Sequence, residues 1–250
     1  MGVSVQSTVE PRTFSNVVDR LMAACGDTRP GTVVGPSDRA KLAMEAANEA
    51  VDRVYNKARW LFRFKWARID LVEDTMWYDL PDDFDQPATN ISSYSEEVTI
   101  KYLEWSQLLE KYPKLRAFDS TFASDAIAIG QQALLTEYFG TPTLFTLTSE
   151  SVGLFKIPNE AFVDANTYLY WSYYRNPVEM VADNDVLDLP KQFWLAHFYI
   201  ALGKYKQNLE YDDYVADEQR GEGYLNDLAA SDYLLVARNQ KDQIDANYNE

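Results

Sequence analysis

The chain has 250 residues, of which 46% are hydrophobic and 25% charged. This ordinary balance for a globular protein excludes wholesale disorder and fibrous repeats. The formal net charge is −16, so the chain is a poor candidate for neutralising nucleic-acid phosphates. One cysteine excludes an intrachain disulfide and a thiolate zinc cluster, while 17 Tyr, 12 Phe and 6 Trp make aromatic side chains unusually frequent.

Two helices are predicted first along the chain. Thr13 is a suitable N-cap, and apolar residues at helical spacing follow it as far as Cys25, which we expect to be a small core residue. Ser37 caps a second, longer helix that reaches about Trp66, and its alanine-rich stripe indicates close packing against another helix. Residues 38–68 hold eight basic side chains against four acidic ones, a net charge of +4.

A β-rich region is predicted next. After Arg68 the apolar period changes from helical to about two, and Leu80-Pro81 stops a short strand. Residues 143–148 and 153–157 are typical of a hairpin, whereas 126–139 fit a helix or a strand.

The clearest strand pattern spans residues 166–175. On this strand Tyr168, Tyr170 and Tyr174 face one way, and the opposite face carries Leu169, Trp171 and Tyr173. A strand that is apolar on both faces is buried on both, so we expect this one to lie in a core or in a subunit contact.

The C-terminal part of the sequence returns to helix. Pro190 suits a first helical turn, and a long polar helix follows residue 210. Residues 210–250 hold eleven acids and three bases, so this sixth of the chain carries −8 of the net charge. We therefore predict an α+β fold in which residues 1–67 and 186–240 form a helical bundle, 68–185 form a β-rich insertion, and 241–250 form an exposed acidic tail.

The residues offer little reaction chemistry. No nucleotide-binding, zinc-protease or serine-hydrolase motif is present, and His197 lies among apolar neighbours, where a core histidine is expected. Asp82, Asp83 and Asp85 follow a strand stop and favour turn formation over a calcium site or a glycosidase carboxylate pair. Residues 183–185 begin like a calcium loop but lack the later ligands. We expect no catalytic residue, no cofactor and no metal site.

The abundance of Tyr and Trp leaves two kinds of surface open. Both residue types are enriched in protein interfaces, and both also stack on sugars in carbohydrate-binding modules. The sequence favours an interface over sugar binding. A glycoside hydrolase that uses Asp83 is the weakest alternative.

One ordered set of landmarks resembles a known family. The landmarks are aromatic runs and Leu-Pro stops, in the order 59–62, 66–68, 77–84, 138–142, 154–158, 169–177 and 183–190, followed by a helix with Phe193. Their order and spacing over residues 40–205 resemble the head-to-tail adaptor proteins of tailed bacteriophages, including the tail tubular A type.

The resemblance implies a structural virion protein that is not an enzyme. Such a protein is expected at the head-tail junction as a homo-oligomeric ring, a dodecamer, between the portal protein and a tail tube or nozzle protein. DNA would pass through the ring without specific binding during genome ejection, and the chain would be made in the cytoplasm of the bacterial host. No membrane partner is expected, because no window approaches 18 uncharged apolar residues. The alternative is a carbohydrate-binding virion or surface protein.

A ring subunit needs two lateral surfaces, and the basic second helix and the acidic C-terminal segment are complementary in charge. The candidate interface residues are Arg53, Lys57, Arg59, Arg63, Tyr168, Tyr170, Trp171, Tyr173, Tyr224, Leu228, Leu235 and Arg238.

Overall fold

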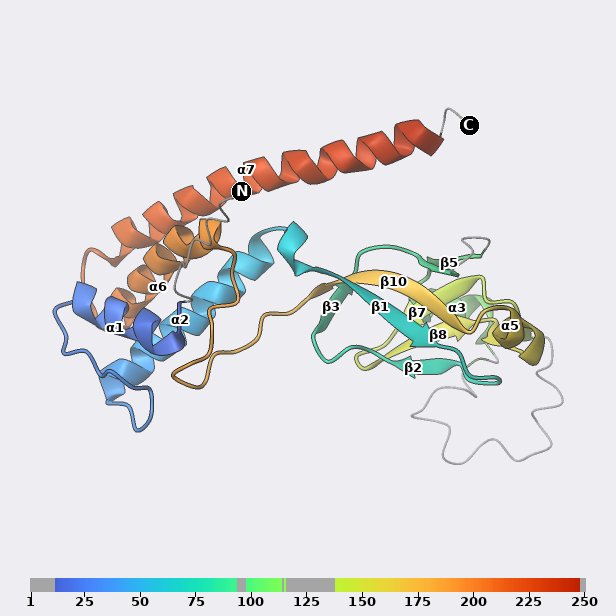
Figure 1. Cartoon of the computed structure of the whole chain (residues 1–250), viewed down its shortest axis with the longest axis horizontal. Helices are drawn as coiled ribbons and strands as arrows, with labels where there is room; N and C mark the ends of the chain where they lie inside the picture. The colour runs from blue at the N-terminus through green and yellow to red at the C-terminus, as the bar shows by residue number, and fades with distance from the viewer. Residues whose placement is uncertain (1–11, 94–97, 114, 116–137, 248–250) are drawn as a thin grey trace, which may run out of the picture. The chain divides into compact units, whose positions relative to one another are not determined.

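The computed structural model describes residues 12–93, 98–113, 115 and 138–247, with side chains described as far as residue 231 (Figure 1). The described chain divides into two compact units. One comprises the residues up to Arg63 together with those from Asn176 onward, and the other comprises Phe64–Arg175. We call them the helical unit and the sheet unit.

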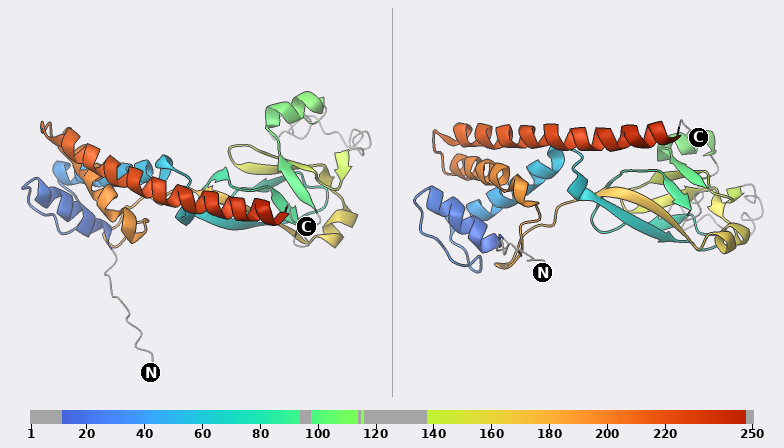
Figure 2. Two further views of the ribbon diagram at one scale, coloured as in Figure 1. Left: turned by 90° about the horizontal axis from the view of Figure 1, so that it is seen from above. Right: turned by 45° about the horizontal axis from the view of Figure 1, so that its top comes forward.

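The helical unit is built around α2 and α6. Its elements are α1 (Phe14–Ala24), α2 (Asp38–Lys57), the 3-10 turns η1 (Leu61–Arg63) and η4 (Lys191–Phe193), α6 (Trp194–Asn208) and α7 (Tyr214–Asn247). Helices α6 and α7, orange and red in Figure 2, run side by side. One hydrophobic core joins α1, α2 and α6 with the first half of α7.

Local sequence explains why α2 forms and what it packs against. The hydroxyl of Ser37 accepts the backbone N–H of Ala40 at 3.2 Å, which satisfies a donor of the first turn. The stripe residues Ala43, Ala47 and Ala50 are fully buried, and α6 contacts α2 along the bundle. The predicted cap and the predicted close helix contact are therefore confirmed.

The sheet unit contains one large sheet and a small one. The strands of the large sheet are β1 (Phe64–Asp70), β2 (Trp77–Asp79), β3 (Phe84–Pro87), β4 (Ile91–Ser93), β5 (Thr99–Tyr102), β7 (Leu144–Leu147), β8 (Ser151–Phe155) and β10 (Tyr168–Arg175). Their order is β1-β10-β4-β5-β7-β8-β2, and β3 pairs with β10 beside β4. Strands β6 (Phe139–Gly140) and β9 (Ile157–Pro158) form the small sheet, and the short helices α3 (Trp105–Lys111) and α5 (Glu160–Ala165) lie between strands in sequence.

The predicted fold class, α+β with a helical bundle and a β-rich insertion, is wrong. The chain has a mixed α/β fold in which eight strands form one nearly closed, barrel-like sheet, with six α-helices among the described residues (Figure 1). Pairing is also mixed, because β5 and β7 are parallel while their neighbours are antiparallel. The period-two pattern identified strands, but it does not encode which distant strands pair, so closure of the sheet was missed.

Several element boundaries also differ from the predictions. The second helix ends at Lys57, and the aromatic run after it turns into β1 at Phe64, because Phe64, Trp66 and Arg68 alternate with residues of the other face. Helix α7 continues to Asn247 through most of the predicted tail. Cys25 is half-buried and packs against the helical core.

Other predictions concern the hairpin, the ambiguous segment and membrane insertion. The hairpin is confirmed by antiparallel β7 and β8, while most of the ambiguous segment 126–139 lies outside the described residues. Among the helices of the described chain, none is long and apolar enough to cross a membrane.

Candidate protein-protein interfaces

The histidine is a structural residue. His197 on α6 is 1% exposed, and its Nε2 lies 2.9 Å from the carbonyl oxygen of Ala47 on α2. A carbonyl only accepts hydrogen bonds, so Nε2 carries the proton. Burial lowers the pKa of His197 to about 4, which keeps the ring neutral at physiological pH. This confirms the prediction of a core histidine.

The acidic residues after β2 make a structural link. Asp83 accepts hydrogen bonds from Nζ of Lys65 at 2.5 Å and from the hydroxyl of Tyr173 at 2.6 Å. Burial raises the pKa of Asp83, but these two donors outweigh it and hold that pKa below its ordinary value. Burial and the Asp83 carboxylate raise the pKa of Tyr173. Asp83 thus links β1 to β10. Residues 82–83 form the predicted turn, which the backbone N–H of Phe84 closes by donating to the carbonyl of Pro81 at 2.9 Å.

The carboxylates at 183 and 185 also organise loops. Asp185 accepts the backbone N–H groups of Val181 and Ala182, each at 2.7 Å, and Asp183 accepts the hydroxyl of Thr32 at 2.7 Å. Within the described part of the chain, no group of three or more His, Cys, Asp or Glu residues is placed to hold a metal ion. Asp185 thus closes a local turn, whereas Asp183 links this segment to the loop at Thr32.

The basic and acidic helices meet within one chain. Arg53 and Lys57 of α2 pair with Glu218 and Glu222 of α7: Arg53 Nε lies 2.6 Å from Glu222 Oε1, Lys57 Nζ lies 3.1 Å from Glu222 Oε2, and Arg53 also bonds Glu218. We call these four residues the α2–α7 ion-pair seam. The charge complementarity expected between neighbouring copies is satisfied inside each copy, so these cations are already neutralised.

We expect Glu222→Gln to weaken this seam modestly. Burial raises the pKa of Glu222, but Lys57 and Arg53 lower it more, and the net shift is downward. Losing one partly exposed carboxylate should reduce the free energy of unfolding by about 1 kcal/mol in low salt and by less at high ionic strength. Urea unfolding at two salt concentrations measures this. Asp227→Asn removes an equal charge from an exposed position of α7 and should change little; equal losses in both variants would contradict the seam.

The other predicted residues of the helical unit divide by burial. Arg59 is exposed. Arg63 is 2% exposed and donates from Nη1 to the carbonyl of Tyr55 at 2.6 Å, so it supports the fold and is removed from the candidate surface. Tyr224 stacks on Tyr199, with ring centroids 5.9 Å apart. Leu228 is half-buried against the helical core, and the side chains of Leu235 and Arg238 lie outside the described residues.

The aromatic residues of β10 are buried on one face, whereas the other face carries two half-exposed tyrosines and the buried Tyr174. Trp171 and Tyr173 are 1% and 4% exposed, in contact with Phe84. On the opposite face Tyr168 and Tyr170 are half-exposed, with ring centroids 5.0 Å apart. The expectation that β10 is buried on both faces therefore fails at these two tyrosines, and Trp171 and Tyr173 are core residues rather than surface residues.

The neighbouring strand adds residues that the sequence interpretation missed. Strand β1 pairs with β10 so that Phe64 lies opposite Tyr174, Arg68 opposite Tyr170 and Asp70 opposite Tyr168. Trp66 lies on the same face and is 68% exposed. We call Phe64, Trp66, Arg68, Tyr168 and Tyr170 the aromatic strip. The alternation of 64, 66 and 68 was its signal, but the predicted helix extended over it.

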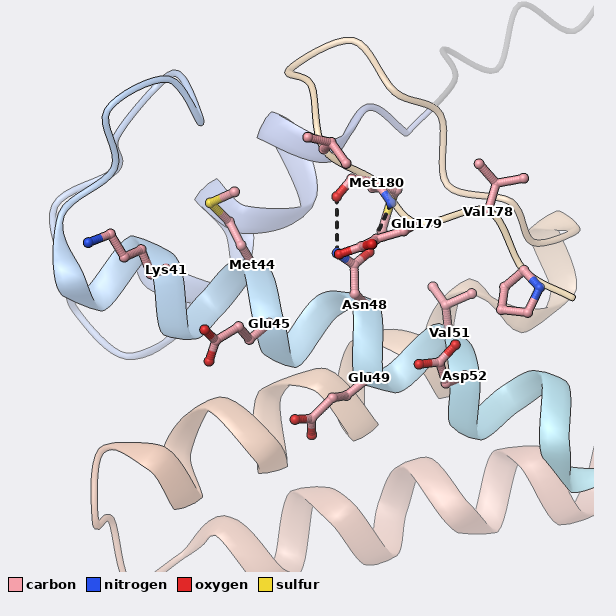
Figure 3. A pocket seen from close by; sticks show the side chains of 12 residues that line it. Lys41, Met44, Glu45, Asn48, Glu49, Val51, Asp52, Val178, Glu179 and Met180 are labelled. Carbon is pink, nitrogen blue, oxygen red and sulfur yellow. Dashed lines mark hydrogen bonds between the residues drawn. The ribbon is translucent and has the colours of Figure 1, made fainter.

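A groove lies on the helical unit between α2 and residues 177–181 (Figure 3). Its volume is about 610 Å³. Asn48 fixes its wall, because its side chain donates to the Met180 carbonyl at 3.0 Å and accepts the Met180 N–H at 3.2 Å. Carboxylates from Glu45, Glu49, Asp52 and Glu179 line it. Burial raises the pKa of Asp52, and Glu179 and Glu49 raise it further.

The described residues thus present two surface features that can contact other macromolecules, an aromatic strip and a carboxylate-lined groove, and no group of metal ligands. The family described as SU10 adaptor protein matches residues 12–247. The chain belongs to this family, which makes it a head-to-tail adaptor of a tailed bacteriophage and confirms the resemblance found in the sequence. It is a virion protein of a structural family, and it associates with other virion proteins such as the portal and tail. No curated protein matches the sequence.

Proposed function

We propose that the chain forms a homo-oligomeric ring, a dodecamer, between the portal protein and a tail tube or nozzle protein, and that the ring extends the DNA channel without catalysing a reaction. The family match carries this proposal, because it spans 12–247 and so includes both the helical unit and the sheet unit. The whole described chain is therefore accounted for by an adaptor role. The carbohydrate-binding alternative is not favoured by this match.

Electrostatics support the conduit part of the proposal. The chain carries a net charge of −16, so a ring of such chains would surround its channel with negative potential. Clustered Lys and Arg bind DNA by neutralising its phosphates and releasing the cations condensed on them, and an acidic wall offers no such exchange. DNA would slide through the ring without adhering to it, as genome ejection requires.

The same electrostatics set a condition on assembly. Copies of one acidic chain repel one another, and this repulsion is strongest at low ionic strength, where the screening length exceeds about 10 Å. A portal ring that binds each copy would raise its local concentration and offset that repulsion. We therefore expect ring formation on the portal and little ring formation by the free protein at low salt.

Mixing the purified protein with the portal ring encoded by the same genome tests the proposal. The expected result is a portal that carries an additional ring, measured as added mass by native mass spectrometry and as a new annulus in negative-stain images. The free protein at the same concentration is the control. A portal that remains unoccupied at high protein concentration would refute the adaptor ring, and binding of only one or two copies would refute its ring form.

A further inference from the structure

The aromatic strip is an exposed face on an edge of the sheet. Strand β1 is at one end of the strand order, so among the described strands only β10 pairs with it (Figure 1). Trp66, 68% exposed, lies next to Phe64, with ring centroids 5.6 Å apart in an edge-to-face arrangement. Exposing a large indole to water forfeits the free energy that burying it would supply. Trp is also among the residues that most often dominate binding energy in protein interfaces.

Neighbouring side chains hold the strip in place before any partner binds. Phe64 contacts Tyr174 across the two strands, with centroids 6.1 Å apart. The guanidinium of Arg68 lies 5.3 Å from the ring centre of Tyr168 and pairs with Asp70 at 2.9 Å. Because these side chains are already ordered, a partner that covers the strip loses less conformational entropy on binding.

Charge indicates which partner fits the strip. Arg68 and the adjacent Asp70 compensate one another, so the strip together with Asp70 is electrically neutral on a chain whose net charge is −16. A basic partner would gain more binding free energy on the acidic surfaces, such as the carboxylate-lined groove, than on the neutral strip. A second copy of this chain is itself acidic, so the acidic surfaces repel it. Electrostatic repulsion between two copies is weakest where they meet at a neutral, apolar face.

We propose that the aromatic strip is a lateral contact by which one copy binds the next, an inference that rests on the proposed ring. In a ring the contact is heterologous, so the strip of one copy covers a different surface of its neighbour. Trp66 is the anchor of the contact, and Tyr168 and Tyr170 extend it along β10. Because the contact is apolar and the copies repel elsewhere, added salt should strengthen it.

Photocrosslinking identifies the occupant directly. Trp66 is replaced by p-benzoylphenylalanine, and equal amounts of isotopically heavy and light copies are mixed with the portal ring of the same genome. Irradiation should give peptides that join heavy to light copies of this chain. The same replacement at Tyr211, which is 38% exposed on the helical unit, is the control. Crosslinks from position 66 only to the portal protein, or none between copies, would overturn the proposal.

The Trp66→Ser variant tests whether the contact drives assembly. With its circular-dichroism spectrum and melting midpoint unchanged, it should need at least about tenfold more protein to fill the portal ring, whereas Tyr211→Ser should behave as the parent. If the variant fills the portal ring at the same concentration as the parent protein, the proposed strip contact is wrong while the adaptor role stands. If the parent itself never binds the portal, the adaptor role fails, and crosslinking of concentrated free protein at high salt still decides whether copies meet at position 66.

Discussion

Replacing Gly221 by alanine should lower the free energy of unfolding by about 2 kcal/mol, because α6 and α7 approach too closely there for a methyl group. A Cβ at this position would lie 2.7 Å from the backbone nitrogen of Ile200 and 3.1 Å from the carbonyl oxygen of Ala196. Backbone atoms cannot rotate away as a side chain can, so the helices must separate. Separation would also loosen Leu225, which is fully buried one turn further along α7.

The chain supplies a matched control two residues away. Gly223 is exposed on the same helix, and a Cβ there would meet nothing within 4 Å. Gly223→Ala should therefore stabilise the protein by about 0.5–1 kcal/mol, because alanine is a better helix former than glycine. Urea unfolding followed by circular dichroism compares the two variants. Stabilisation by both would show that α7 does not pack on α6 at this distance.

A glycine on the facing helix α6 independently indicates the same close approach of α6 and α7. A Cβ on Gly203 of α6 would lie 2.8 Å from the backbone nitrogen of Glu218 on α7. The two glycines thus bring the helices together in one region, which also places Glu218 and Glu222 within reach of Arg53. Close packing and the ion-pair seam are therefore consequences of the same helix contact.

Local features of the helices could be predicted from the sequence because they depend on near neighbours. The Ser37 cap and the buried alanine stripe of α2 are encoded within a few turns. The period-two pattern likewise located β7, β8 and β10. The end of α2 was missed because the aromatic residues after Lys57 satisfy both a helical stripe and the alternation of β1.

Pairing over long distances could not be predicted in the same way. One partner of Arg53 is Glu218, 165 residues further along the chain, and charge alone does not say whether such groups meet within one copy or between two. Likewise Trp66 is exposed because it lies on the face of β1 and β10 opposite the one that carries the buried Trp171, and local alternation does not reveal which face is covered. The candidate interface is therefore the aromatic strip, which includes the predicted residues Tyr168 and Tyr170 and leaves out Arg53, Arg63 and Trp171.

The stability of the protein should decrease as the pH falls from about 6.5 towards 4, in part because of His197. Burial holds the pKa of this residue at about 4 in the folded chain, with a further lowering from Arg12 that opposes the effect of the Ala47 hydrogen bond. The unfolded chain binds the proton near pH 6.5. The contribution of neutral His197 to the free energy of unfolding is thus fully present above about pH 6.5. It decreases below that pH, by about 2 kcal/mol at pH 5 and about 3 kcal/mol at pH 4.

His197→Gln isolates this contribution, because the amide N–H of glutamine can still donate to the carbonyl of Ala47 and no longer titrates. Near pH 7 the variant should lose only about 1 kcal/mol from imperfect packing. Acidic groups whose pKa values are lowered, such as Asp83 and Glu222, titrate equally in both proteins and cancel in the comparison. The free energies of unfolding should therefore converge as the pH falls, and the variant should be the more stable protein by pH 4.5. Parallel curves from pH 7 to pH 4.5 would mean that the folded chain accommodates a protonated His197, which its 1% exposure and single carbonyl partner argue against.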